Sequence, residues 1–304
     1  MGDKSGKSPS SGRRATFLRR SASTLGLWVV VAVALASGED WACLGLAGLF
    51  TVVASIEFFR MGKAAGAECF PRFGVLVSAL YVVLVYGMLL RFGEGGGYEI
   101  PGLVDAAAVY TVVVGAVVLR LRFPIRDNGP LFAVGSNLLG FVYLTLMFNF
   151  VARLIFLVPG SGELPGIWLV LWLVAVTKFT DMGAYIVGTA IGKHKMIPHI
   201  SPGKTWQGFG GALVFAQLAG CGLWWLMPGK LAPLGGWGHV VFLGVVLALL
   251  AVVGDLAGSI IKRSLKAKDS GSALPGIGGS FDLIDSICFT APFFYFYLKW
   301  ILIK

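Results

Sequence analysis

Long apolar runs, separated by short segments rich in glycine, proline or charge, fill the chain from residue 24 to its end. A helix needs about 20 mostly apolar residues to cross a bilayer, and backbone outside such helices has to lie in water or inside protein. Nine segments are assigned on this basis: 24–37, 41–59, 73–90, 103–119, 131–150, 167–190, 207–227, 239–260 and 281–302. The pattern therefore predicts an all-α, polytopic integral membrane protein with about nine transmembrane helices.

The polar segments divide the chain into three expected parts. Residues 1–23 are serine-rich and basic, which predicts a disordered cytoplasmic tail. Residues 24–160 hold the N-terminal transmembrane helices, and residues 161–304 form a C-terminal transmembrane catalytic region, because polar side chains crowd together after residue 178. The first apolar run also fits a cleaved signal peptide, an alternative that leaves the orientation of the later spans unchanged.

Composition supports a membrane setting. Hydrophobic residues make up 57% of the chain and charged residues 13%, whereas a soluble domain carries about twice that charge. The net charge of +10 follows the topology: 19 of the 25 Lys and Arg residues fall in segments on the side of the N-terminal tail. Five fall on the other side, namely Arg91, Arg153, Lys230, Lys299 and Lys304. This positive-inside pattern predicts a cytoplasmic amino terminus, and it explains the basic charge by the lipid bilayer, with no nucleic acid partner.

Two stretches near the predicted cytoplasmic face carry the candidate chemistry, and the first begins at Lys178 and Asp181. Their three-residue spacing puts both on one helix face, where they can form an ion pair. Ionisable groups inside a span usually face a cavity and mark function, although a structural ion pair is the plainer alternative.

A loop at residues 192–206 follows, with three lysines and several hydroxyl groups. Ser201, Lys204 and Thr205 suit a triphosphate or a lipid phosphate, while ordinary positive-inside charge would account for the lysines alone. Gly203-Lys204-Thr205 resembles the end of a P-loop, but Pro198 stands where the leading glycine of that motif belongs. His194 and His199 lack a partnering cysteine, and the four cysteines have neither metal nor redox spacing, so a zinc site is not expected.

The second stretch contains three carboxylates, Asp255 in the eighth span and Asp282 and Asp285 at the start of the ninth. Three such groups in one membrane-level cavity repel one another unless cations lie between them, and Mg²⁺ prefers carboxylate, water and phosphate oxygens. Between them lie further polar groups and a glycine run that exposes backbone amides, namely Ser259, Lys262, Arg263, Lys268, Asp269, Gly278 and Gly279. This combination is typical of a metal-assisted phosphoryl or nucleotidyl transfer site, with a charge cluster at a helix boundary as the alternative.

The stretch from Ser259 to Asp285 closely resembles the signature of the phosphatidate cytidylyltransferase family, the CDP-diglyceride synthetases. Its residues read Ser-Ile-Ile-Lys-Arg-Ser-Leu-Lys-Ala-Lys-Asp-Ser-Gly-Ser-Ala-Leu-Pro-Gly-Ile-Gly-Gly-Ser-Phe-Asp-Leu-Ile-Asp. The segment from Asp181 through Gly192-Lys193-His194-Lys195 to Gly208 is similar to the same family. These matches cover about a third of the chain, residues 178–288.

The resemblance implies that the phosphate of phosphatidate attacks the α-phosphorus of CTP and that pyrophosphate leaves. It implies Mg²⁺, alone or with a second cation such as K⁺, held by Asp255, Asp282 and Asp285. Phosphate contacts would come from Lys262, Arg263, Lys268 and Lys204, with Ser201, Thr205 and the Gly278 and Gly279 amides completing the cradle. Lys178 and Asp181 would orient the site or reach the lipid phosphate. The resemblance also implies a homodimer in the bacterial inner membrane.

Two positions depart from the family pattern and leave rate and substrate preference open. Ile277 stands where the family usually has His, and Leu283 where it usually has Arg. Alternatives are a CTP-dependent transferase acting on another lipid, a polyprenol kinase, a non-enzymatic homologue and a membrane transporter. A transporter would predict an internal repeat, which the sequence does not show.

Overall fold

In the computed structural model, the described part of the chain contains eight helices that are long and apolar enough to cross a membrane. The structure describes residues 33–34, 39–92, 99–125, 128–158, 165–271 and 278–303. Spans two to nine of the sequence analysis each coincide with one of these helices, so the all-α, multi-pass prediction is confirmed for them. The first predicted span and the tail at 1–23 lie outside the described residues, apart from 33–34.

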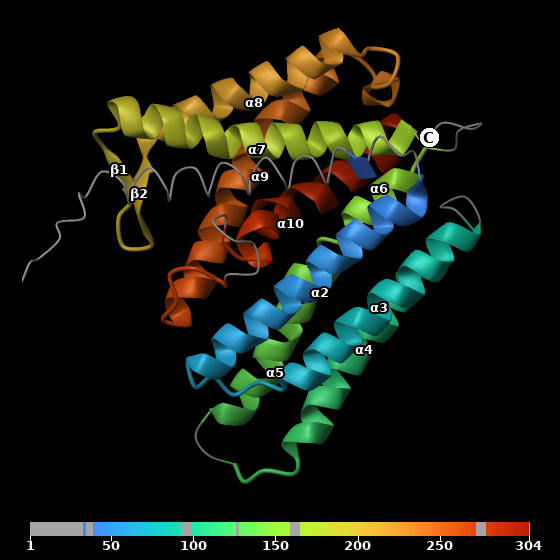
Figure 1. The fold of residues 1–304 in the computed structure, drawn as a ribbon, viewed down its shortest axis with the longest axis vertical. Helices are drawn as coiled ribbons and strands as arrows, with labels where there is room; N and C mark the ends of the chain where they lie inside the picture. Colours follow the sequence, from blue (N-terminus) through green and yellow to red (C-terminus); the bar gives the residue numbers. More distant parts are fainter. Residues whose placement is uncertain are drawn as a thin grey trace, which may run out of the picture.

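The elements follow one another with short connections (Figure 1). The helices of the N-terminal half are α2 (Asp40–Ala64), α3 (Pro71–Phe92), α4 (Glu99–Arg120), α5 (Gly129–Gly140), the π-helix η1 (Phe141–Leu146) and α6 (Phe150–Phe156). The C-terminal half contains α7 (Pro165–Ile191), β1 (Lys195–Ile197), β2 (Ser201–Thr205), α8 (Trp206–Leu226), the 3₁₀ turn η2 (Ala232–Leu234), α9 (Trp237–Ser264), α10 (Ser280–Tyr297) and the π-helix η3 (Leu298–Leu302).

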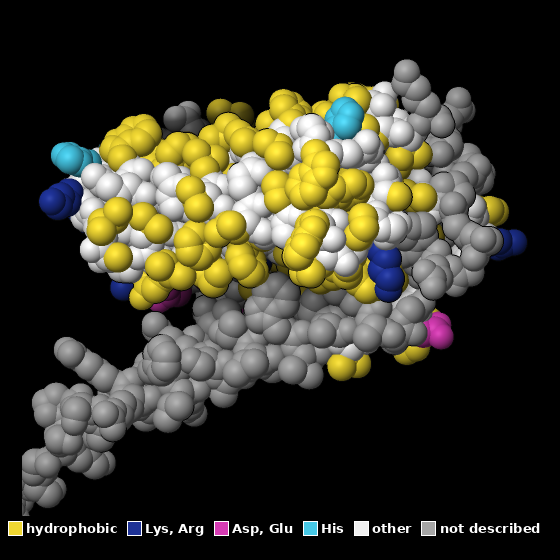
Figure 2. Space-filling view, turned by 90° about the horizontal axis from the view of Figure 1, so that it is seen from above, with side chains coloured by type: hydrophobic (Ala, Val, Ile, Leu, Met, Phe, Trp, Pro, Cys, Tyr) yellow, Lys and Arg dark blue, Asp and Glu magenta, His cyan; other side chains and the backbone are white. Residues whose placement is uncertain are grey.

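The N-terminal helices pack in sequence, α2 on α3, α3 on α4 and α4 on α5. In the C-terminal half α7 lies along α8, and α9 packs between α8 and α10 (Figure 1). Helix α10 also contacts α2 and α6, which joins the two halves through a shared apolar core. Figure 2, which looks onto the α7 and α8 side, shows apolar side chains over most of that face and basic ones mainly at its margins. Exposed α8 residues such as Leu218 and Trp225 belong to this lipid-compatible surface.

The segment at 192–206 differs from the expected flexible loop. It forms an antiparallel hairpin in which Lys195 pairs with Thr205 and Ile197 with Ser201. The chain reverses in a turn at residues 197–200, which has Pro198 at its second position and a hydrogen bond of 3.3 Å from the Ile200 amide to the Ile197 carbonyl. The hairpin leads directly into α8, whose first turn is capped by the Thr205 hydroxyl oxygen, which accepts a hydrogen bond from the Gly208 amide at 3.1 Å.

Arg153 is a second difference, because the charge count placed it in a loop on the non-cytoplasmic side. It lies inside the helical stretch 129–156, is 6% exposed, and forms an ion pair of 2.6 Å with Asp105 of α4. Tyr81 of α3 donates to the same carboxylate at 2.7 Å. A charge inside the apolar part of the chain therefore finds its partner on other helices, as a buried charge requires.

Helices α7 and α8 approach closely through glycines, which yields a stability prediction. A Cβ atom on Gly211 would lie 2.5 Å from the Val187 side chain and 2.7 Å from the Gly183 carbonyl oxygen, whereas one on the neighbouring Gly210 would meet nothing within 4 Å. We expect Gly211→Leu to cost about 1–3 kcal/mol of stability by overpacking and to lower the Tm in detergent by several degrees. Gly210→Leu is the matched control and should leave the Tm nearly unchanged. Equal shifts for the two variants would contradict this packing.

Candidate active site

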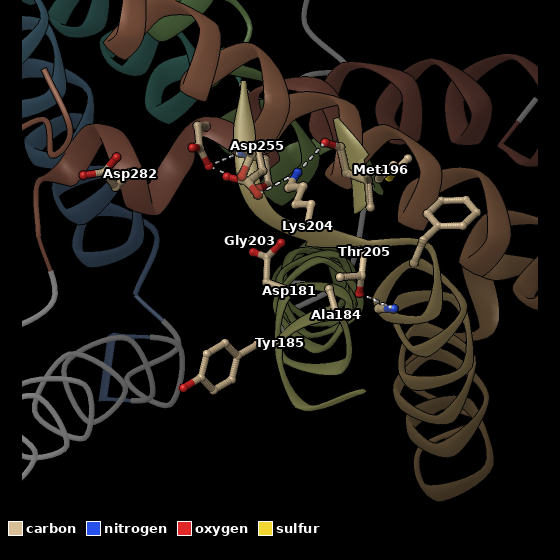
Figure 3. Close-up of a pocket in the computed structure, with 15 residues that line it drawn as sticks. Asp181, Ala184, Tyr185, Met196, Gly203, Lys204, Thr205, Asp255 and Asp282 are labelled. Atoms are coloured by element: carbon tan, nitrogen blue, oxygen red, sulfur yellow. Dashed lines mark hydrogen bonds and ion pairs between the residues drawn. The ribbon is translucent and has the colours of Figure 1, made fainter. Parts of the chain in front are cut away.

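A cavity of about 410 Å³ lies where the hairpin, α7, α8, α9 and α10 meet (Figure 3). Several predicted site residues line it together, namely Asp181, Ser201, Lys204, Thr205, Asp255, Asp282 and Asp285. They come from both polar stretches, although up to 104 sequence positions separate them. The structure therefore brings the two stretches into one site.

The predicted pair on α7 is present. Lys178 Nζ lies 3.5 Å from Asp181 Oδ2, and it also donates to the main-chain oxygen of Leu283 on α10 at 2.8 Å. Asp181 lines the cavity. Lys178 does not line it, but connects α7 with α10. Leu283 itself packs its side chain against the apolar core, so the position where the family usually has Arg contributes only its carbonyl to this contact.

Lys204 joins the hairpin to α9. Its Nζ atom lies 2.8 Å from Asp255 Oδ2 and donates to the Val252 carbonyl at 3.2 Å (Figure 3). The Lys204 side chain is 18% exposed and that of Asp255 39%, so the pair borders the cavity and is still reachable from it. Placed there, an ammonium group can exchange its carboxylate partner for a phosphate oxygen.

Asp282 is held from several sides at the start of α10. One of its carboxylate oxygens accepts an ion-paired hydrogen bond from Lys262 of α9. The other accepts from the Ser270 hydroxyl at 2.7 Å, the Ser270 amide at 3.2 Å and the Gly279 amide at 3.4 Å. In Figure 3 Asp282 lies to one side of the Asp255–Lys204 pair. The Gly279 amide, expected to face an anionic ligand, faces this carboxylate.

Asp285 is the most deeply placed acid of the cavity, with only 3% of its surface exposed. Its Oδ1 atom accepts hydrogen bonds from the Ser286 amide at 2.6 Å and the Ser286 hydroxyl at 3.2 Å. Small residues on α9 make room for it, because a Cβ atom on Gly258 would lie 2.6 Å from Asp285 Oδ2. Glycine at 258 therefore allows α9 to approach this carboxylate closely.

The other predicted residues lie outside the cavity lining. Lys178 and Lys262 contact acids that line it, Asp181 and Asp282 respectively. Arg263, Lys268 and Asp269 are exposed, and Arg263 donates to the Ala267 carbonyl at 3.3 Å. Ser259 is half-buried on α9, and Gly278 has a φ of +120°, a backbone conformation that glycine adopts without strain. Ile277 lies outside the described residues.

Sequence reasoning missed several groups around the cavity. Tyr185 and Phe209 line it beside Met196, and nothing in their spacing distinguishes them from ordinary lipid-facing or core residues. Glu57 was also missed: it is 4% exposed on α2 and contacts the start of α10. An acid inside the predicted span 41–59 was the signal that could have found it.

Comparisons with known proteins identify the family. Residues 18–301 match the model of the cytidylyltransferase family. The chain is 43% identical over 251 residues to a phosphatidate cytidylyltransferase of Brucella suis, covering 82% of this chain and 83% of the relative. It is 31% identical over 276 residues to a phosphatidate cytidylyltransferase of Mycobacterium bovis, covering 88% and 84%. The uncharacterised protein YnbB of Escherichia coli is 33% identical over 173 residues, which is 57% of this chain and 56% of that protein.

The chain belongs to the cytidylyltransferase family. Within this cytidylyltransferase the cavity and its nearest partners hold four carboxylates, on Asp181, Asp255, Asp282 and Asp285, against three ammonium groups, on Lys178, Lys204 and Lys262. The excess of acid at this site favours an additional cation when anionic phosphates are to be bound beside it.

The donor set of this cytidylyltransferase fits Mg²⁺ in kind, because all the lining acids offer hard carboxylate oxygens. No three His, Cys, Asp or Glu side chains form a ready-made metal cage within the described ranges. Mg²⁺ sites at phosphates usually use only one or two carboxylates and complete their coordination with water and substrate oxygens. Asp255, Asp282 and Asp285 therefore stay the predicted ligands of a site that substrate would complete.

Proposed function

We propose that this protein is a phosphatidate cytidylyltransferase, which transfers the CMP unit of CTP to phosphatidate and releases pyrophosphate. The single observation that carries the proposal is the cavity that gathers Lys204, Asp255, Asp282 and Asp285 at membrane-embedded helices, in a chain of the cytidylyltransferase family. A site between spanning helices suits an acceptor that is itself a lipid. The names of the Brucella and Mycobacterium relatives support the same acceptor.

In the proposed reaction a phosphate oxygen of phosphatidate forms a bond to the α-phosphorus of CTP. The bond from that phosphorus to the bridging oxygen of the β-phosphate breaks, and the electron pair leaves with pyrophosphate. The attacking phosphate is already ionised near neutral pH, so the site needs no strong general base. Catalysis then rests on positioning two anions and on neutralising their charge.

Different residues of the site would neutralise the charge of the substrates and position the helices around them. Lys204, freed from Asp255 when a phosphate enters, would neutralise the triphosphate, and Lys262 would do the same beside Asp282. Mg²⁺, bound by the carboxylates, would supply further charge neutralisation at the phosphoryl oxygens. Lys178, held by Leu283 and Asp181, would keep α7 and α10 in register at the cavity.

The proposal includes a location. The cavity adjoins the hairpin. Basic residues lie just before and in the hairpin, at Lys193 and Lys195, and in the last turn of α9, at Lys262 and Arg263. The excess of basic residues on that side supports a cytoplasmic active site in the bacterial inner membrane, where CTP is available. A homodimer and a second cation such as K⁺ stay predictions of the family resemblance.

A release assay tests the reaction and its metal requirement together. Purified protein in detergent or vesicles with CTP, Mg²⁺ and phosphatidate is expected to release pyrophosphate and to form a CDP-lipid, and excess EDTA is expected to stop both. Parallel reactions with diacylglycerol, a polyprenol and a polyprenyl phosphate define the acceptor. Release with another lipid but not with phosphatidate would reassign the substrate, and the absence of release with every acceptor would contradict the proposed function.

A further inference from the structure

A buried acid outside the catalytic stretches touches the start of α10. Glu57 lies near the end of α2 and is 4% exposed, and its Oε2 atom accepts a hydrogen bond of 3.0 Å from the backbone amide of Phe281, 224 positions away. Burying a carboxylate in an apolar span costs free energy, so such a residue usually has a functional role. Glu57 lies on α2, which contributes no residue to the cavity lining, and its contact is with α10, which contributes Asp282 and Asp285.

The first turn of α10 has backbone amides that need an acceptor. The residue before the helix, Gly279, has no side chain to accept their hydrogen bonds, although helices usually obtain this cap from Ser, Thr, Asp or Asn. Glu57 supplies the missing oxygen from another helix by accepting from the amide of Phe281, the second residue of α10. A negative group at a helix N-terminus is also favoured by the helix dipole.

Two glycines leave room for the Glu57 carboxylate. A Cβ atom on Gly279 would lie 2.4 Å from Glu57 Oε2, and one on Gly271 would lie 2.7 Å from Glu57 Oε1. Gly271 and Gly279, although eight positions apart in the chain, therefore both lie close to the Glu57 carboxylate. A capping side chain at position 279 would therefore collide with the Glu57 carboxylate and displace it.

Ser270 connects Glu57 with the cavity. Its hydroxyl oxygen lies 2.7 Å from Asp282 Oδ2 and 3.5 Å from Glu57 Oε2, so its single proton goes to the nearer Asp282. Glu57 is thus linked to Asp282 through the Phe281 amide, which precedes Asp282 in the chain, and it lies near the Ser270 hydroxyl that donates to Asp282. Moving the start of α10 would move Asp282, and with it Asp285 one turn later.

We propose that Glu57 is a positioning residue of the cytidylyl transfer, which caps α10 from α2 and so fixes Asp282 and Asp285 in the cavity. This inference rests on the proposed function for its kinetic consequence, but not for the contact itself. Glu57 does not line the cavity, so it acts through α10 and not on substrate.

Steady-state kinetics in detergent test the role. Glu57→Ala removes the cap and is expected to lower kcat by about 10–100-fold, since small misplacements of reacting groups have effects of that order, with the KM for CTP within threefold of wild type. Glu57→Gln keeps an oxygen for the Phe281 amide and should retain kcat within about threefold. Ser55→Ala is the matched control, because Ser55 is buried on the same helix and its hydroxyl contacts the Thr51 carbonyl at 2.9 Å and the Thr145 hydroxyl at 3.5 Å, neither of which belongs to α10.

Hydrogen exchange measured by mass spectrometry separates this inference from the proposed function. In Glu57→Ala the peptide covering residues 278–284 should exchange about fivefold faster, the usual consequence of losing a helix cap, while α7 and α8 stay as in wild type. Unchanged exchange there, or an alanine variant with kcat within threefold of wild type, would overturn the positioning role. If the alanine variant does not fold, Glu57→Asp, whose shorter side chain withdraws the oxygen, should show the slowed kcat, and full activity would overturn the role equally. A wild type without transferase activity would reject only the proposed function.

Discussion

Asp282→Asn is expected to reduce cytidylyl transfer by about 10²–10³-fold and to lower the Tm in detergent, with the protein still folded. Lys262 donates to one carboxylate oxygen, and Ser270 and Gly279 donate to the other. An asparagine amide offers a single oxygen, so one of these two sets would meet an NH₂ group and lose its acceptor. The substitution also leaves the Lys262 ammonium without its counter-charge beside the predicted metal site.

The measurement is single-turnover and steady-state release of pyrophosphate at saturating CTP and Mg²⁺. Glu39→Gln is the matched control, because Glu39 is an exposed acid just before α2, at the other end of that helix from Glu57. It should retain full activity. An Asp282→Asn protein that keeps more than a tenth of wild-type turnover would show that this carboxylate is not part of the catalytic machinery.

Lys204→Met is expected to lower kcat/KM for CTP by about 10²-fold. The substitution keeps the aliphatic stem and removes the ammonium group that bridges Asp255 and the Val252 carbonyl at the wall of the cavity. Two effects combine: the triphosphate loses a cation, and Asp255 keeps its negative charge without a partner. Both raise the free energy of bringing phosphates into the cavity.

Initial rates over a range of CTP concentrations measure this effect. Lys230→Met is the control, since Lys230 lies in the turn after α8, at the far end of that helix from the hairpin, and its ammonium group lies over the Trp168 ring. A Lys204→Met protein with wild-type kcat/KM would exclude Lys204 from substrate binding. Lys204→Arg should recover part of the loss, because it restores the charge but not the point-like geometry of the ammonium group.

The helical spans were predictable from local pattern because each transmembrane helix satisfies its own backbone and needs only length and apolar composition. The ends of α3, α7, α8 and α9 lie within a few residues of the predicted limits. The hairpin at 195–205 was not predictable in the same way. Its strands are short, and their pairing depends on a turn and on the packing of α7 against α8.

The candidate site was predictable in its residue types and only partly in its arrangement. The pair Lys178–Asp181 follows from spacing on a single helix, and the structure contains it. The pairs Lys204–Asp255 and Lys262–Asp282 join different elements, and no local pattern indicates which lysine meets which acid. Ser270 is buried and hydrogen-bonded to Asp282, whereas its neighbours Lys268 and Asp269 are exposed. Nothing in the sequence indicates which of the three is buried.

The sequence by itself determined the membrane setting, the order of the spans and the two polar stretches that carry the chemistry. These depend on composition and on spacing within one helix, where the geometry is the same in every protein. Only the tertiary structure decided that the stretches share one cavity and that Glu57 meets the Phe281 amide across 224 positions. The physical reason is that a polar group buried among helices must be satisfied by whichever neighbour the packing brings to it.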